Sequence, residues 1–317
     1  MNQKEELNRA VDKVIPQVVE EAREQQRLNR TVPISGTRYT LSLPGREIEI
    51  AYYAAKSTRA PLIVAYHGGG FLFGGSALDD ELWVHVSGCL DANVASVNYR
   101  MSPEVKDYAC LEDAYDSAVY LASHAQEFGF DPNQISVFGC SAGGNLAAAV
   151  ALMAKQKGTL KLDNQILMYP FLDGFTDPDE KGEGSFSGLM PHVMNRLHFS
   201  PECAKDPLLS PVFAEPEQLA DLPKAIIVYC EEDNLRHEAI AYGQKLKNAG
   251  VETAVFCAEK MPHGFIESGF KEVIDDFTRQ FLGSNAQELV EGGLLRKTSE
   301  EAMEFVRKEF RKEFVRS

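Results

Sequence analysis

A serine in a glycine-rich turn is the strongest chemical signal in this chain. The stretch from Gly139 to Gly143 reads G-x-S-x-G, with Ser141 at its centre. The apolar run 135–138 before it is typical of a strand, and the Ala- and Leu-rich run 142–156 after it is typical of a helix. A serine on such a strand-to-helix turn has its hydroxyl exposed, so Ser141 is a candidate nucleophile.

A serine hydroxyl reacts only when a base takes its proton and an acid orients that base. Asp233 follows the strand-like run 225–230, and His263 follows the run 252–257. Sites in open parallel sheets form at the carboxyl ends of strands, and the order serine, acid, histidine is known for this kind of nucleophile. We therefore predict that Ser141, Asp233 and His263 meet. Two neighbours of Asp233 remain alternatives for the acid: Glu231 and Glu232.

Acyl transfer also needs N–H donors directed at the oxyanion that develops. The strand-like run 61–66 leads directly into Gly68, Gly69 and Gly70, whose amides no side chain covers. The amide of Ala142 is the expected partner donor. A phosphate-binding loop is disfavoured, because G-x-G-x-x-G spacing and a Gly-Lys-Ser/Thr ending are both missing.

Strand-like and helix-like runs alternate along the middle of the chain, which predicts the α/β class with a parallel sheet covered on both faces. The predicted strands are 61–66, 93–98, 135–138, 165–169, 225–230 and 252–257, and the predicted helices are 110–127, 142–156, 237–249 and 267–282. A hairpin is expected over 37–43 and 46–52. A helix over 3–29 precedes it, and Pro16 is expected to kink or divide that helix.

Two segments depart from this alternation. Residues 174–206 form an apolar insertion, which we expect to contribute to a cap over the site. Residues 299–317 have a helical apolar stripe, which packs either on the chain's own fold or on a second copy in a homo-oligomer. The predicted divisions are an N-terminal helical segment over 1–35, an α/β domain over 36–283, and a C-terminal helical extension over 284–317.

Composition limits the partners and cofactors. The formal net charge of the 317 residues is −15, which disfavours nucleic acid and anionic membranes as partners. No apolar run approaches the ~20 residues that span a bilayer. The chain starts without the apolar segment of a signal peptide, so we expect a cytoplasmic protein. The six cysteines form no C-x-x-C pair, and we expect no metal and no other cofactor.

Seven motifs in the order found here resemble the hormone-sensitive-lipase-like family of α/β-hydrolase carboxylesterases. They are His67-Gly68-Gly69-Gly70-Phe71, Tyr99-Arg100-Met101-Ser102-Pro103-Glu104, Leu111-Glu112-Asp113-Ala114, Gly139-Cys140-Ser141-Ala142-Gly143-Gly144, Asp206-Pro207-Leu208-Leu209-Ser210-Pro211, Asp233-Asn234-Leu235-Arg236 and His263-Gly264-Phe265. The resemblance implies an α/β-hydrolase fold with a mostly parallel central sheet flanked by helices. It also implies a Ser141–Asp233–His263 triad, an oxyanion hole from residues 68–70 and Ala142, and a cap from the N-terminal helices and the insertion.

Two positions near the predicted site depart from that family. Cys140 stands where its members usually carry aspartate, and His237 stands where aspartate is frequent. A role for Cys140 as a second nucleophile stays open, because thiol reactivity depends on a lowered pKa that the sequence does not reveal.

The expected activity is that of a serine carboxylesterase, with a small ester of acetyl to butyryl length as substrate and an acyl-serine intermediate. A non-catalytic small-molecule receptor on the same scaffold and an amidase, such as an arylformamidase, are the alternatives. Four aromatic residues could line an acyl pocket or belong to the core: Phe71, Phe73, Phe171 and Phe265. Arg100 and Glu104 are expected to form an internal ion pair rather than to bind substrate.

Overall fold

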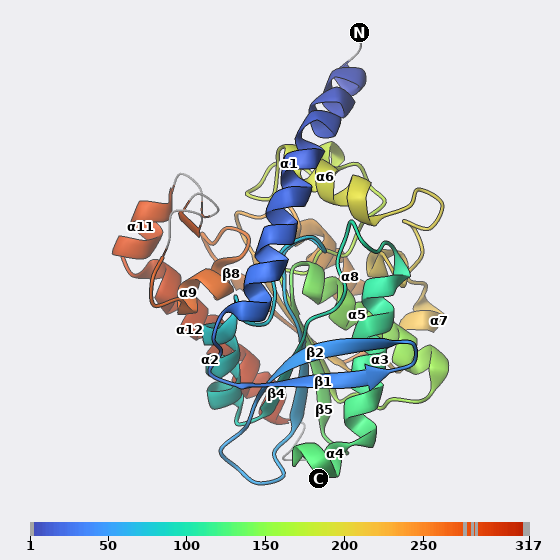
Figure 1. The fold of residues 1–317 in the computed structure, drawn as a ribbon, viewed down its shortest axis with the longest axis vertical. Coiled ribbons are helices and arrows are strands. Elements are labelled where there is room, and N and C mark those ends of the chain that lie inside the picture. Colours follow the sequence, from blue (N-terminus) through green and yellow to red (C-terminus); the bar gives the residue numbers. More distant parts are fainter. Residues whose placement is uncertain (1–2, 275–277, 280–281, 283–284, 313–317) are drawn as a thin grey trace.

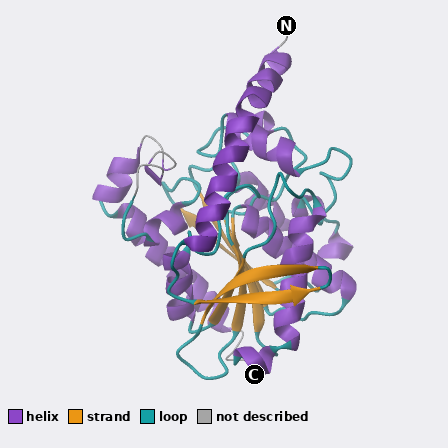
Figure 2. Cartoon of the chain, viewed as in Figure 1, coloured by secondary structure: helices purple, strands orange, loops and turns teal. Residues whose placement is uncertain are grey.

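The computed structural model describes residues 3–274, 278–279, 282 and 285–312, and an eight-stranded sheet runs through its centre (Figures 1 and 2). The strand order is β1-β2-β4-β3-β5-β6-β7-β8. The strands are β1 (Thr37–Leu43), β2 (Arg46–Tyr53), β3 (Leu62–Tyr66), β4 (Asn93–Val97), β5 (Ile135–Cys140), β6 (Asn164–Met168), β7 (Lys224–Cys230) and β8 (Thr253–Ala258). Strands β1 and β2 pair antiparallel, as do β2 and β4, and the other neighbours pair parallel. This is the mostly parallel α/β sheet that the alternating runs predict.

Helices cover both faces of the sheet. They are α1 (Gln3–Thr31), α2 (Asp80–Leu90), α3 (Tyr108–Ser123), α4 (Ala125–Phe128), α5 (Ala142–Lys157), α6 (Leu189–His198), α7 (Pro216–Leu219), α8 (Arg236–Asn248), α9 (Phe265–Phe270), α11 (Ala286–Glu291) and α12 (Leu294–Lys312), with short 3-10 turns η1 (Pro178–Glu180) and η2 (Pro211–Phe213).

Side chains of the central strands alternate between two apolar layers. Leu62 and Val64 of β3 join a core cluster with α3, α5 and α8, while Ile63 and Ala65 join a cluster with α2, α9 and α12. All five side chains of β3 are buried. A strand that is buried on both faces reads as a continuous apolar run, which is why the sequence signals these strands clearly.

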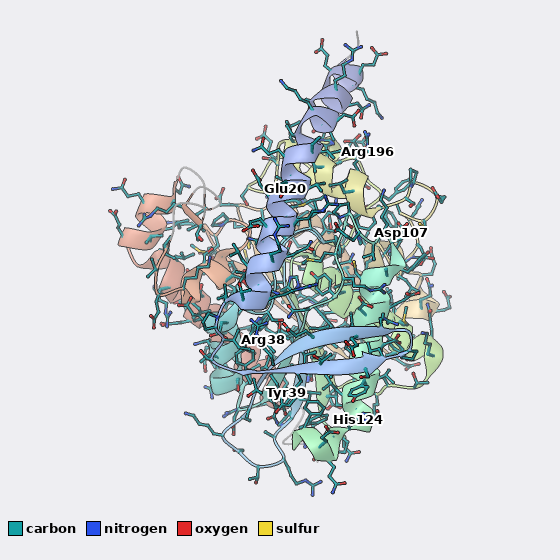
Figure 3. The ribbon with its side chains drawn as sticks, viewed as in Figure 1. Glu20, Arg38, Tyr39, Asp107, His124 and Arg196 are labelled. Carbon is teal, nitrogen blue, oxygen red and sulfur yellow. The ribbon has the colours of Figure 1, made fainter. Side chains whose placement is uncertain are left out.

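The N-terminal helix packs against the insertion. Val11 and Val18 of α1 form an apolar cluster with Val193 and Leu197 of α6. Leu72 of the glycine loop, the glycine-rich residues 67–75 after β3, joins this cluster. At the surface of this contact, Arg196 of α6 donates to Asp12 and Asn8 of α1, and Figure 3 shows Arg196 beside α1. Pro16 lies inside α1 and does not divide it.

Most predicted element boundaries agree with the structure to within a few residues. The predicted helix 110–127 is interrupted at His124, between α3 and α4. The predicted helix 267–282 is wrong over residues 271–274, because Lys271 takes an extended conformation and ends α9 at Phe270. Residues 275–277 and 280–281 of that prediction lie outside the described residues. Helices α2 and α6 were not predicted as elements.

The apolar stripe of the C-terminal extension packs on the chain's own fold. Ala302, Met303, Val306 and Phe310 of α12 are at most 1% exposed, in a cluster with α2 and α9. Phe314, the last member of the predicted stripe, lies outside the described residues. The stripe that suggested a homo-oligomer is thus covered within one chain. Among the helices that the structure describes, none is both long and apolar enough to cross a membrane.

This packing makes α12 part of the core. We expect Met303→Ala to lower the free energy of unfolding by about 2–5 kcal/mol, since it leaves a cavity under a fully buried side chain. Urea denaturation of both proteins measures the difference. Glu301→Ala, at an exposed position of the same helix, is the control and should change stability by less than about 0.5 kcal/mol. An unchanged unfolding midpoint for Met303→Ala would mean that α12 does not stabilise the fold.

Candidate active site

Ser141 lies on a sharp turn between β5 and α5. Its backbone angles are φ 54° and ψ −116°, a region that residues with a side chain seldom adopt. The Ser141 amide donates to the Met168 carbonyl over 2.9 Å, and the Ser141 carbonyl accepts from the Phe171 amide over 3.0 Å. These bonds to the end of β6 and to the segment after it hold the unusual conformation in place.

The flanking glycines are required by close approach of the backbone. A Cβ atom on Gly139 would lie 1.9 Å from the Gly143 carbonyl oxygen, and one on Gly143 would lie 2.0 Å from the Tyr66 carbonyl oxygen. Neither position has room for any other residue. The turn therefore needs glycine on both sides of Ser141.

The structure brings the three predicted residues together. His263 Nε2 lies 2.8 Å from Ser141 Oγ, and His263 Nδ1 lies 2.6 Å from Asp233 Oδ2. Each of the three side chains follows the carboxyl end of a different strand: β5 for the serine, β7 for the aspartate and β8 for the histidine. All three are at most 6% exposed, so water screens their interactions weakly.

Asp233 is the carboxylate that faces the histidine. Its Oδ1 accepts from the Leu235 amide over 3.0 Å, which leaves Oδ2 for His263. Glu231, one of the alternatives, accepts from the Lys260 amide instead. Glu232, the other, has an exposed side chain. Asp233 is thus the carboxylate that hydrogen-bonds with His263 Nδ1.

The surroundings of His263 favour its protonated form. Burial alone would lower its pKa, but the charge and hydrogen bond of Asp233, with smaller contributions from Glu267 and Glu238, raise it above the ordinary 6.5. Ser185 Oγ accepts from the His263 amide over 2.8 Å, and the Phe186 ring centroid lies 4.8 Å from that of His263. Ser185 and Phe186 belong to the insertion and were not predicted as site residues.

The glycine loop lies against the turn at Ser141. A Cβ atom on Gly68 would be 3.6 Å from Ser141 Cβ. Gly69 and Gly70 have positive φ angles of 107° and 62°, and in the described part of the chain neither amide donates to a protein acceptor. His67 is fully buried with its ring 4.3 Å from that of Tyr99, and burial lowers its pKa to about 4. The neutral His67 ring thus packs beneath the loop as a structural support.

Comparison with known proteins identifies the family. A family described as alpha/beta hydrolase fold matches residues 63–267, well over half of the chain. The chain belongs to this family. The sequence is 33% identical over 246 residues to an arylesterase of Saccharolobus solfataricus, covering 74% of this chain and 79% of that protein. It is 32% identical over 212 residues to esterase LipI of Mycobacterium tuberculosis, covering 65% of this chain and 66% of that protein, slightly less than two thirds of it.

A solved structure agrees with this assignment. An esterase of Pyrobaculum calidifontis superposes with a TM-score of 0.72 at 31% identity, over 89% of this chain and 93% of that one. The resemblance to α/β-hydrolase carboxylesterases and the predicted fold are thereby confirmed.

Three of the four predicted aromatic residues lie near the glycine loop and the turn. The Phe71 ring centroid is 6.3 Å from that of Phe171, and the Phe171 amide is the donor to the Ser141 carbonyl. Phe73 packs against the cluster of α1 and α6. Phe265 is placed differently: it is fully buried in the cluster with α2 and α12, against Tyr169.

Arg100 and Glu104 do not pair with each other, which corrects the expected ion pair. Arg100 donates twice to the fully buried Asp113, through Nε over 2.8 Å and Nη2 over 2.9 Å. Glu104 pairs with Arg23 of α1 over 2.8 Å. Both residues brace loops of the α/β-hydrolase fold.

Cys140 is fully buried beneath the turn. Burial raises the pKa of its thiol well above the ordinary value, and the nearby carboxyl groups of Glu267 and Asp79 raise it further. A thiol with a raised pKa stays protonated and is a poor nucleophile. The second-nucleophile alternative therefore finds no support in the surroundings of Cys140.

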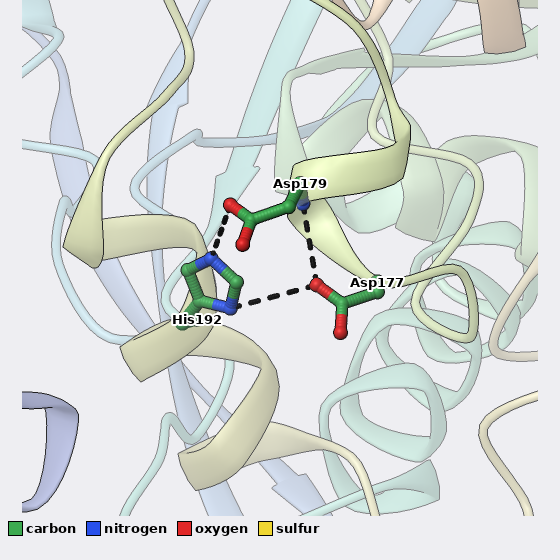
Figure 4. A group of neighbouring side chains, drawn as sticks. All are labelled: Asp177, Asp179 and His192. Carbon is green, nitrogen blue, oxygen red and sulfur yellow. Dashed lines mark hydrogen bonds and ion pairs between the residues drawn. The ribbon is translucent and has the colours of Figure 1, made fainter. Parts of the chain in front are cut away.

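A separate polar cluster lies within the insertion (Figure 4). His192 Nε2 lies 3.0 Å from Asp179 Oδ1, and the Asp179 amide donates to Asp177 over 3.2 Å. The ligand atoms of the three side chains are all within 4.8 Å of one another. These contacts join η1 to α6, and we interpret the cluster as a link inside the insertion.

The close approach at Gly143 gives a direct test of the turn. We expect Gly143→Ala to destabilise the protein by more than about 2 kcal/mol, because the added methyl meets the Tyr66 carbonyl. Gly88→Ala, on α2 where a Cβ meets nothing within 4 Å, is the matched control. It should be neutral or stabilising by up to about 1 kcal/mol. Thermal unfolding compares the two, and equal effects would contradict this account.

Proposed function

We propose that this protein, a carboxylic ester hydrolase of the α/β-hydrolase fold family, cleaves short-chain acyl esters through an acyl-serine intermediate. The observation that carries the proposal is the chain of contacts from Asp233 through His263 to Ser141, with distances of 2.6 and 2.8 Å. Ser141 Oγ attacks the ester carbonyl carbon while His263 Nε2 takes its proton. Asp233 fixes the imidazole tautomer and stabilises the imidazolium that forms.

The same site stabilises the oxyanion and protonates the leaving alcohol. The amides of Gly68, Gly69, Gly70 and Ala142 are the proposed donors to the tetrahedral intermediate. As it collapses, the carbon–oxygen bond to the leaving alcohol breaks, and His263 passes its proton to that alcohol. Water then attacks the acyl-serine with His263 again as base, which releases the acid and restores Ser141.

We propose that α1 and the insertion 174–206 form a cap over this site. Met194 of α6 lies directly against the glycine loop, since a Cβ on Gly70 would be 2.2 Å from its sulfur. Phe71, Phe171 and Phe199 are buried and pack with ring centroids 5.7–6.3 Å apart beside the turn. Because these rings already fill the space, a long acyl chain would have to displace them. This packing supports a preference for acetyl to butyryl groups.

Activity on a substrate series tests the proposal. We expect hydrolysis of 4-nitrophenyl acetate and butyrate, with much lower kcat/KM on the dodecanoate and on a matched 4-nitroanilide. Ser141→Ala and His263→Ala should each lower kcat by at least about 10⁴-fold with the fold intact by circular dichroism. Ser123→Ala, at an exposed position, is the control that keeps full activity. Full activity of Ser141→Ala would rule the mechanism out, and ligand binding without turnover would favour a receptor.

The pH dependence follows from the state of His263. Only the neutral imidazole can accept the Ser141 proton, and its pKa is raised above 6.5. We therefore expect kcat/KM to be maximal in mildly alkaline solution and to fall as the pH drops through a value above 6.5. Initial rates on 4-nitrophenyl acetate in buffers of constant ionic strength measure this acid limb of the kcat/KM profile. A limb at or below pH 6 would contradict the assigned environment of the base.

A further inference from the structure

A carboxyl group outside the three proposed catalytic residues lies beneath the turn. Glu267 is on α9, four residues after His263, and its Oε2 accepts a hydrogen bond from the Tyr169 hydroxyl. Its Oε1 lies against the glycine loop, since a Cβ on Gly68 would be only 3.3 Å away from it. One side chain thus contacts both the loop of proposed oxyanion donors and the residue that follows β6.

Tyr169 connects this carboxyl group to the reacting residues. Its ring centroid lies 5.1 Å from that of His263, in an edge-on arrangement. Tyr169 is 1% exposed and has a positive φ of 35°, and its amide donates to the Val228 carbonyl over 2.6 Å. A buried phenol needs an acceptor for its hydroxyl, and Glu267 is that acceptor. Glu267 therefore fixes the ring that packs against the proposed base.

Cys140 is the third residue of the group formed with Glu267 and Tyr169. It is fully buried, and its thiol lies close enough to Tyr169 and Glu267 for both side chains to influence its pKa. The residue before Ser141 thus presents a neutral side chain to the carboxyl group of Glu267. The carboxyl group beneath this turn is therefore that of Glu267 on α9, while Cys140 within the turn carries a thiol.

We infer that Glu267 is a positioning residue of the active site, which holds Tyr169 and the glycine loop against the turn and adds negative charge beside His263. This inference rests on the proposed function. Glu267 has no contact with a reacting atom and acts through Tyr169 and His263.

Several ionisable groups share these surroundings. The groups that act on His263 are Asp233, Glu238 and Glu267, with Ser141 and Tyr169 as its uncharged neighbours. Glu267 in turn influences the pKa values of Asp79, Cys140, Cys230 and Tyr169, and Lys271 influences that of Asp79. Burial raises the pKa of Asp79 to about 8, and Glu267 contributes to that shift. Asp79 is therefore largely protonated at neutral pH.

The experiment separates charge from shape. Glu267→Gln keeps the volume and an acceptor for Tyr169 but removes the charge. We expect the acid limb of kcat/KM to move to lower pH by about half a unit, because the imidazolium loses a stabilising charge. The plateau kcat should fall about threefold, because half a pKa unit corresponds to about a threefold change in the stability of the imidazolium. Glu272→Gln removes the same charge from an exposed position five residues along and should leave both values unchanged.

A second pair of variants adds a carboxyl group at position 140 and then removes the one at position 267. Cys140→Asp should lower the melting temperature, because it buries a carboxyl group against Glu267 and Asp79. Combining it with Glu267→Gln should relieve that loss and return the acid limb towards its wild-type pH. Additive effects of the two substitutions on stability would show that the side chains do not interact.

Direct titration keeps this test separate from the proposed function. The pKa of His263, read from its imidazole NMR resonances, should drop in Glu267→Gln whether or not an ester is turned over. If the wild-type protein hydrolyses no ester, the proposed function fails while this readout still applies. A folded Glu267→Gln protein with the wild-type His263 pKa and kcat overturns the inference. Should Glu267→Gln not fold, Tyr169→Phe decides: a lower kcat with an unchanged limb is expected, and wild-type kcat contradicts it.

Discussion

The positive φ of Ser141 ties the candidate active site to the sheet beneath it. A non-glycine residue at φ 54° is strained, and it persists only where its surroundings hold it. Here the last residue of β6 binds the amide of Ser141, and Phe171 in the segment after β6 binds its carbonyl. Strand β3 approaches so closely that Gly143 has no room for a Cβ. The parallel sheet thus supplies the backbone bonds that keep the serine hydroxyl turned towards His263.

The same sheet explains why distant residues share one site. Strands β5, β7 and β8 run parallel, so the segments after them emerge at the same edge. Asp233 and His263 are 30 residues apart in the sequence, yet their side chains lie 2.6 Å apart. Around this edge, α1 and the insertion pack on each other, and α6 reaches the glycine loop through Met194. The proposed site is therefore built from a rigid sheet edge and a separate helical cover.

Much of this arrangement could be predicted from the sequence because its signals are local. Buried strands such as β3 are continuous apolar runs, and the glycines around Ser141 mark a turn with no room for side chains. The helix predicted over 267–282 was wrong over residues 271–274, because an extended Lys271 ends α9 and the apolar pattern does not record that backbone change. Helix α2 was missed, although it carries Trp83 into the core.

Residue types and neighbours along the chain were enough to predict the α/β order of elements, the turn at Ser141 and the candidates Asp233 and His263. The folded chain was needed to show which carboxylate faces His263, that Arg100 pairs with Asp113, and that α12 packs on its own chain. It alone placed Glu267 beside Cys140 and Tyr169. Such contacts join side chains far apart in the sequence, and their geometry is fixed by how helices and strands pack, which no local pattern encodes.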